Sequence, residues 1–140
     1  MFKEKRLLTG QEKKQIETIL KGELSPRREI SFAYLHGSFL SDLPCGDVDV
    51  ALYLEEGFTS DNHWEYEAEL AMLLDRKLGL PIDILTLNHA PVTLRYHATT
   101  GKVLFSNNEL ARYTFLEKTW REYFDYLPLL KAYLHDLLEQ

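Results

Sequence analysis

Residues 30–54 read ISFAYLHGSFLSDLPCGDVDVALYL, two apolar segments that are joined by a short spacer. The first segment, Ile30–His36, carries Ile, Phe, Tyr and Leu and runs directly into Gly37-Ser38, which is the profile of a buried strand that ends in a turn. The second segment, Asp47–Leu54, alternates valine and leucine with acidic or small residues, which predicts another strand. We therefore expect a small sheet at the centre of the fold.

Two carboxylates meet at the start of the second predicted strand. Asp47 and Asp49 are two residues apart, and side chains with that spacing project to the same face of a strand. Adjacent like charges repel, so the pair is favourable only when a cation lies between them. Magnesium suits this position, because it takes one or two protein carboxylates and completes its shell with water and phosphate oxygens. Asp47 and Asp49 are therefore candidate magnesium ligands.

The turn before the spacer has the composition of a phosphate-binding turn. Gly37 allows the backbone to approach a ligand closely, and Ser38 can offer its hydroxyl and nearby N–H groups to a phosphate. Each motif alone has a simpler interpretation, since Gly-Ser is often only a turn and Asp-x-Asp is often a solvated strand edge. Their order, with eight residues between Ser38 and Asp47, instead indicates a nucleoside-triphosphate site.

A third carboxylate strengthens this interpretation. Asp83 lies between Ile82 and Ile84 in a run that is otherwise apolar, where an unpaired charge is costly. One interpretation is an aspartate at a sheet edge that pairs with a lysine or arginine. The functional alternative is a third metal ligand that also accepts the proton of an attacking hydroxyl.

The rest of the chain is predicted to be mainly helical. Thr9 and Glu12 have the spacing of a capping box at the start of the first helix. Near the C-terminus, Asp125 is placed to cap the last helix, and Pro128 is tolerated in its first turn. The predicted elements are a helix over Gly10–Lys21 ended by Gly22, a helix over Asp61–Leu78 ended by Gly79, a strand over Pro81–Leu87, a strand or extended segment over Lys102–Phe105, and helices over Asn108–Phe124 and Leu127–Leu138. The pattern predicts an α+β fold, a small sheet flanked by helices with a helical C-terminal third.

Composition narrows the class of protein. The 140 residues are 45% hydrophobic, so we expect one globular domain over residues 1–140. The net charge of −6 argues against a surface that binds nucleic acid directly. Cys45 is the only cysteine, which excludes an internal disulfide, and we interpret it as a bystander. No apolar run is long enough to cross a membrane or to form the core of a signal peptide, so we expect a cytoplasmic protein.

Taken together, these residues resemble the minimal nucleotidyltransferases of the DNA polymerase β-like superfamily. The signature of that family is Gly-Ser, a spacer, Asp-x-Asp and a later strand with a third aspartate. The segments Arg95–Phe105 and Tyr123–Pro128 look like the downstream part of MntA-type antitoxins of this family. The matching signature residues here are Gly37, Ser38, Asp47, Asp49 and Asp83.

The resemblance implies a polymerase β-like fold with a small mixed sheet, and the magnesium-dependent transfer of AMP from ATP to a hydroxyl. Asp47, Asp49 and Asp83 would be the catalytic and metal-binding residues, and Gly37 and Ser38 would bind the phosphates. The acceptor would be a hydroxyl, which we expect to be that of a tyrosine, on a partner toxin of the HEPN ribonuclease class. The chain would then be the antitoxin of a toxin–antitoxin pair.

Two alternatives remain open at this stage. The chain could nucleotidylate a small hydroxyl-bearing molecule, or it could be a non-catalytic antitoxin that binds and occludes its partner. The sequence also departs from the family pattern, because the spacer Phe39–Gly46 holds no basic residue and Gly46 precedes Asp47. The triphosphate charge must then be balanced from elsewhere in the chain, for which the candidates are Arg95, Lys102, Arg112 and Lys118.

Overall fold

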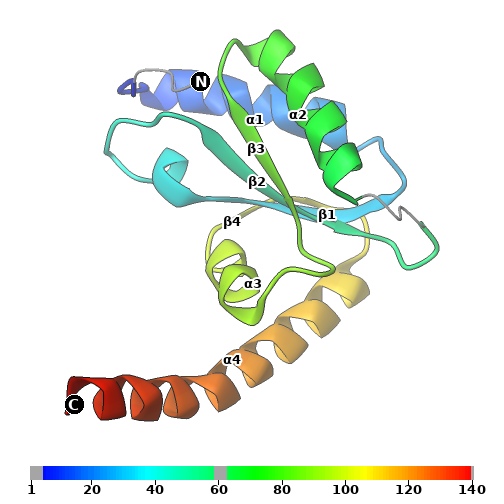
Figure 1. Cartoon of the computed structure of the whole chain (residues 1–140). Coiled ribbons are helices and arrows are strands. Elements are labelled where there is room, and N and C mark those ends of the chain that lie inside the picture. The colour runs from blue at the N-terminus through cyan, green and yellow to red at the C-terminus, as the bar shows by residue number, and fades with distance from the viewer. Residues whose placement is uncertain (1–4, 59–62, 140) are drawn as a thin grey trace.

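The computed structural model describes residues 5–58 and 63–139, and a four-stranded mixed sheet lies at its centre (Figure 1). The strand order is β3-β2-β1-β4; β1 is antiparallel to both of its neighbours, and β2 is parallel to β3. The strands are β1 (Ile30–His36), β2 (Val48–Leu54), β3 (Ile82–Thr86) and β4 (Lys102–Ser106). The expected α+β architecture is confirmed, and the segment after Gly101 is a true strand.

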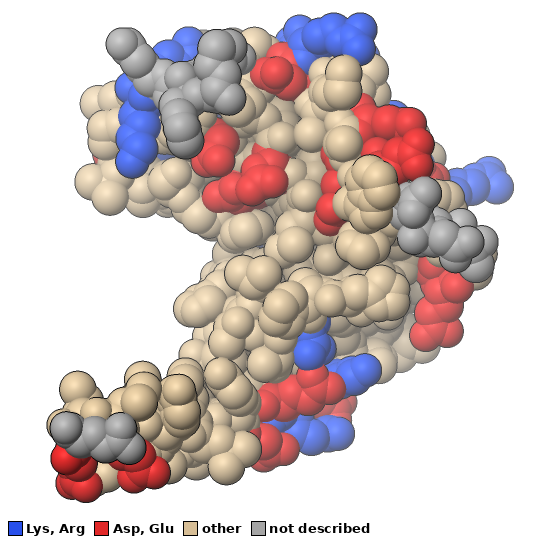
Figure 2. Space-filling model, in the orientation of Figure 1, with Lys and Arg blue, Asp and Glu red and all other residues tan. Residues whose placement is uncertain are grey.

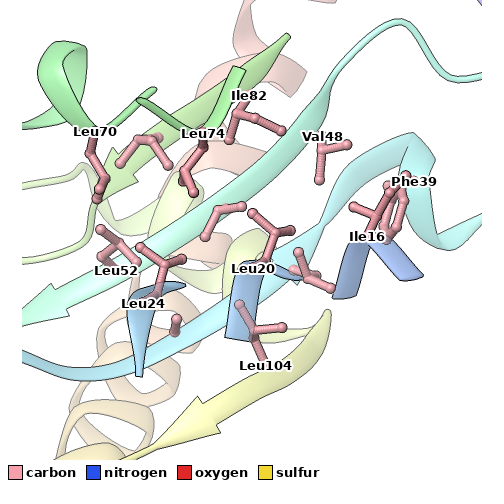
Figure 3. Packing of buried hydrophobic residues seen from close by; sticks show 14 of the residues in the cluster. Ile16, Leu20, Leu24, Phe39, Val48, Leu52, Leu70, Leu74, Ile82 and Leu104 are labelled. Atoms are coloured by element: carbon pink, nitrogen blue, oxygen red, sulfur yellow. The ribbon is translucent and has the colours of Figure 1, made fainter. Parts of the chain in front are cut away.

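Two helices cover one face of the sheet. They are α1 (Gly10–Leu24) and α2 (His63–Leu78), which lie side by side above the sheet in Figure 1. Alternate residues of the strands point into this layer, where Leu20 of α1, Leu74 of α2 and Val48 of β2 are fully buried. Figure 3 shows how side chains from both helices meet those of the strands. Because these apolar side chains are buried on one face, the alternate residues of each strand point to the opposite face of the sheet.

The opposite face is covered by α3 (Val92–Thr99) and α4 (Glu109–Leu138). A smaller aromatic cluster fills this layer, with Phe32 stacked on Tyr53 at a ring-centroid distance of 5.0 Å and Phe115 of α4 tilted against both rings. These two helices cover only part of the sheet. The end of β1 and the beginnings of β2 and β3 stay open on this side.

Helix ends follow the local sequence at some positions and not at others. The capping box is present, since Glu12 N–H donates to Thr9 Oγ1 (3.1 Å) and Thr9 N–H donates to Glu12 Oε1 (3.0 Å). The expected stop at Gly22 is wrong, because α1 continues to Leu24 and Gly22 adopts no left-handed conformation. Gly79 does adopt one (φ 67°) and follows α2 directly. The predicted start of that helix at Asp61 lies outside the described residues.

The expected break between two C-terminal helices is also wrong. Helix α4 is a single element of 30 residues, and Pro128 lies inside it. Proline removes one backbone hydrogen bond and crowds the preceding turn, which bends a helix without having to end it. Figure 1 shows this helix bending before its red C-terminal turns, so Asp125 is an interior residue and not a cap. None of the described helices is both long and apolar enough to span a membrane.

The turn into β4 provides a test of the packing. A Cβ atom at Gly101 would lie 2.0 Å from the carbonyl oxygen of Leu35, a backbone atom that cannot move aside. We predict that Gly101→Ala lowers the free energy of unfolding by about 2 kcal/mol, because β4 must shift away from β1. In contrast, Gly22→Ala in α1 meets nothing within 4 Å and should stabilise the protein by about 0.5–1 kcal/mol. Urea denaturation of the two variants measures both effects, and equal stabilities would contradict this account.

Candidate active site

The turn after β1 is shaped to receive an acidic side chain. Gly37 opens the short 3-10 helix η1 (Gly37–Leu40) with φ 79°, a conformation that favours glycine. A Cβ atom at this position would lie 2.3 Å from Oδ2 of Asp49. Glycine is therefore required for two reasons, its backbone conformation and the close approach of a carboxylate. Ser38 follows within the same helical turn and is half-buried.

Three carboxylates converge next to this turn. Asp47 immediately precedes β2, Asp49 is the second residue of β2, and Asp83 is the second residue of β3. Because β2 and β3 are parallel, Asp49 and Asp83 are paired in register. One oxygen atom from each aspartate lies within 4.8 Å of the other two. The structure therefore brings together all three acidic residues that the sequence singled out.

Burial and neighbouring negative charges both favour the protonated form of Asp49. The pKa of Asp49 is raised from 3.8 to about 6, first by burial and then by the charges of Asp47 and Asp83, with a side-chain hydrogen bond to Asp83 adding to the effect. The cluster consists of hard oxygen donors, and its excess negative charge is what a divalent cation would neutralise. These residues fit a magnesium ion in both donor type and charge.

His36 is a site residue that the sequence analysis missed. It ends β1, pairs with Asp49 across the strands, and its buried Nε2 atom has no hydrogen-bond partner among the described residues. Burial lowers the pKa of this imidazole, while Asp83 and Asp47 act in the opposite direction. A neutral ring with a free nitrogen therefore lies next to the carboxylates. In the sequence, only its position just before Gly37 indicated that His36 could belong to the site. Its proximity to Asp49 follows from the pairing of β1 with β2.

The spacer between the turn and the carboxylates is held by contacts with distant segments. Buried Cys45 pairs with Arg6 through two backbone hydrogen bonds (3.0 and 2.7 Å), and its thiol donates to the carbonyl oxygen of Asp47 (2.5 Å). From α1, the ammonium of Lys13 donates to the carbonyl oxygen of Ser41 (2.6 Å). Cys45 thus has a structural role, in agreement with its interpretation as a bystander to the chemistry.

The basic residues proposed to balance phosphate charge are mostly engaged elsewhere. Arg95 of α3 forms an ion pair with Glu122 of α4, and Arg112 of α4 pairs with Glu109 and donates to the hydroxyl of Tyr34 (3.1 Å). Of the remaining candidates, Lys102 pairs with Glu17 of α1, and Lys118 is exposed on α4. In this conformation the first three cations already neutralise carboxylates of the chain.

An open hollow lies on the side of the molecule that carries the site. Figure 2 shows the hollow between the lobe that contains the sheet and the projecting C-terminal part of α4, with acidic side chains along its upper wall. The elements that carry the site, η1 and the beginnings of β2 and β3, lie on this side of the molecule in Figure 1. Exposed Asp83 is the most accessible of the three aspartates. A large acceptor therefore has room to approach.

Comparisons with known proteins agree with this geometry. A family model described as polymerase beta, nucleotidyltransferase matches residues 14–110. Among curated proteins, none matches the chain significantly. Solved structures with a similar fold include a complex of tri-AMPylated HEPN toxin from Shewanella oneidensis with MNT antitoxin, in which one chain is 23% identical with a TM-score of 0.71, over 90% of this chain and 98% of that one.

Two further toxin–antitoxin structures share the fold. A chain of the MntA–HepT complex is 22% identical with a TM-score of 0.66, and the match covers 93% of this chain and 99% of that one. A chain of a toxin–antitoxin structure with AMP-PNP is 23% identical with a TM-score of 0.66, over 87% and 96% of the two chains. The similarity therefore extends over nearly the full length of these chains.

The raised pKa of Asp49 predicts how stability depends on pH without metal. Between pH 3.8 and about 6, the folded protein holds a proton on Asp49 that the unfolded chain has released, so stability falls as pH rises through this range. Above it, metal-free Asp49→Asn should be more stable than the unmodified protein by on the order of 1 kcal/mol, after allowance for solvent screening of a half-buried group. Near pH 4 this difference should shrink.

Urea denaturation in EDTA at several pH values measures the effect. Asp42→Asn, which changes an exposed aspartate of the spacer, is the matched control and should show no such dependence. A difference in stability between Asp49→Asn and the unmodified protein that is constant from pH 4 to pH 8 would contradict the raised pKa of Asp49.

Proposed function

We propose that this chain, which belongs to the polymerase beta nucleotidyltransferase family, transfers AMP from ATP to a hydroxyl of a partner toxin and so acts as its antitoxin. The observation that carries the proposal is the cluster of Asp47, Asp49 and Asp83 beside the turn at Gly37-Ser38. Three carboxylates held this close are unfavourable in a protein that serves only as a scaffold. They are useful where a cation and a polyphosphate bind together.

The residues divide the work according to their positions. Asp47 and Asp49 would hold magnesium, which when bound neutralises phosphate charge, and Asp83 would complete the ligand set. The backbone of η1 and the hydroxyl of Ser38 would bind the outer phosphates, because Gly37 brings that turn against Asp49. The protein thus contributes position and charge to the transfer.

The transfer itself needs one proton acceptor. The acceptor hydroxyl oxygen attacks the α-phosphorus of ATP, the bond from that phosphorus to the bridging oxygen breaks, and pyrophosphate leaves. We assign the hydroxyl proton to the carboxylate of Asp83, because it is the exposed member of the cluster and therefore the one that an acceptor can reach from solvent. Asp49 is less suited, since it is half-buried and lies against the turn at Gly37.

A protein acceptor is supported by the shape of the site and by the comparisons. The hollow beside the carboxylates is open and wide, unlike an enclosed pocket for a small molecule (Figure 2). The solved structures of similar fold include a complex of a tri-AMPylated HEPN toxin with MNT antitoxin and the toxin–antitoxin complex MntA–HepT. By analogy, the partner would be a HEPN-type toxin, with a tyrosine hydroxyl as the acceptor.

Intact mass spectrometry of the partner tests the proposal. We predict that the product of the neighbouring reading frame, incubated with this chain and magnesium ATP, gains one or more AMP-sized increments. The Asp47→Asn/Asp49→Asn variant should give none, because it removes two of the three metal ligands, while Asp42→Asn should behave as the unmodified protein.

Substitution of Asp83 should affect AMP transfer more than nucleotide binding. Asp83→Asn should weaken ATP binding only slightly, because Asp47 and Asp49 remain as metal ligands, and should lose most of the transfer rate, because the proton acceptor for the attacking hydroxyl is gone. A partner that is inhibited without any gain in mass would overturn the proposal and leave occlusion as the mechanism.

A further inference from the structure

The C-terminal half of α4 extends beyond the body of the protein. The first half of this helix packs against the sheet through Phe115 and Thr119, which are both buried. From Phe124 to Leu138, in contrast, every residue is exposed or only partly buried. Figure 1 shows this segment projecting away from the sheet and α3. The helix is therefore longer than packing within the described chain requires.

The projecting segment keeps one apolar face. Six large apolar residues recur at the spacing of a single helix face and continue the line that Phe115 and Thr119 begin. They are Tyr126, Leu127, Leu130, Tyr133, Leu134 and Leu137, which we name the arm face. The opposite side carries Asp125, Ala132, His135 and Asp136, and exposed Leu129 and Leu138 lie at the borders between the two sides. Such separation of apolar from polar residues is typical of a helix that is covered by another element.

The arm face is largely uncovered in the described chain. The exposed fractions of Tyr133, Leu134 and Leu137 are 62%, 47% and 48%. A continuous apolar stripe over about three helical turns is more than the scattered exposed leucines of an ordinary surface, and it is typical of an interaction site. In Figure 2 the side of this segment that borders the hollow is free of charged residues, and its charges lie mainly on the underside.

In the first half of α4, the same side of the helix is covered by another helix. There α3 packs against it, with Tyr96 stacked on Tyr123 at a ring-centroid distance of 3.7 Å and Trp120 tilted beside them. The arm face continues from this helix–helix contact, with the same helical spacing and no partner from the described chain. A second helix is therefore the element that fits along it.

Charge indicates which helix would bind. Between Phe124 and Glu139 there are three carboxylates and one lysine, so with His135 neutral the segment has a net charge of −3 + 1 = −2. The carboxylates are Asp125, Asp136 and Glu139, and the lysine is Lys131. A second copy of this chain would bring the same negative charge, whereas a helix with basic flanks would be attracted.

We propose that the arm face binds an amphipathic helix with basic flanks on the acceptor protein, and so holds that protein in the hollow in front of Asp47, Asp49 and Asp83. The inference rests on the proposed function and adds to it a docking surface separate from the catalytic residues. Chemistry and recognition then lie on opposite walls of one hollow (Figure 2). Loss of docking should raise the acceptor KM and leave the nucleotide site intact.

Paired variants on the two sides of the same helix test this inference. The variant Leu134→Lys/Leu137→Lys places two positive charges on the arm face. The control variant Ala132→Lys places one positive charge on the opposite side of the same segment of α4. All three positions are exposed, so thermal unfolding and ATP binding should stay unchanged in both variants. With the product of the neighbouring reading frame as acceptor, the arm-face variant should lose about tenfold or more in kcat/KM, mainly through KM, and Ala132→Lys should not.

A measurement of acceptor binding without transfer tests the docking surface independently of the proposed chemistry. In the Asp47→Asn/Asp49→Asn background, where no transfer is expected, calorimetry should still detect the acceptor, and adding Leu134→Lys/Leu137→Lys should abolish that binding. This result would support the docking surface even if no AMP were transferred by the unmodified chain. Equal acceptor binding with and without the arm-face changes would overturn it. A chain that is dimeric by analytical ultracentrifugation, and monomeric with the arm-face changes, would also overturn it by assigning the face to a second copy.

Discussion

Asp49 and Asp83 lie side by side because β2 and β3 are parallel and in register, and the carboxylate of Asp47 reaches the same place from just before β2. Their mutual repulsion is opposed by the buried neighbours of each residue, since Val48, Val50, Ile82 and Ile84 anchor the two strands in the core. The packing on one face of the sheet thus holds an unfavourable arrangement on the other. Gly37 depends on the same arrangement, because it leaves room for the carboxylate of Asp49.

The two faces of the sheet are covered to different extents. Helices α1 and α2 seal one face with the larger core, while α3 and α4 cover only the part of the other face that lies beyond the carboxylates. The uncovered part and the projecting end of α4 form the two walls of the hollow. On the proposed function, the described residues would supply both a metal site and a contact surface for the acceptor.

Local sequence patterns predicted the centre of the fold well. Alternation placed Asp47 and Asp49 on one face and their valine neighbours in the core, and this was confirmed. Asp83 reaches Asp47 and Asp49 only because β3 pairs with β2, and no local sequence pattern specifies which strands pair. The expectation that Asp83 joins the other two aspartates therefore came from the family resemblance, whose signature includes a third aspartate on a later strand. The predicted helix break before Pro128 was wrong, because proline lowers local helix propensity without showing whether the helix resumes. His36 was missed since its role depends on a neighbour across the strands.

The central claim is that Asp47, Asp49 and Asp83 form a site for a divalent cation with bound nucleotide. Anomalous diffraction from crystals grown with Mn²⁺, as a substitute for magnesium, and a non-hydrolysable ATP analogue tests it most directly. We expect manganese density among these three carboxylates, with the outer phosphates against η1. Manganese at another position, or an analogue bound with the three carboxylates free of metal, would contradict it.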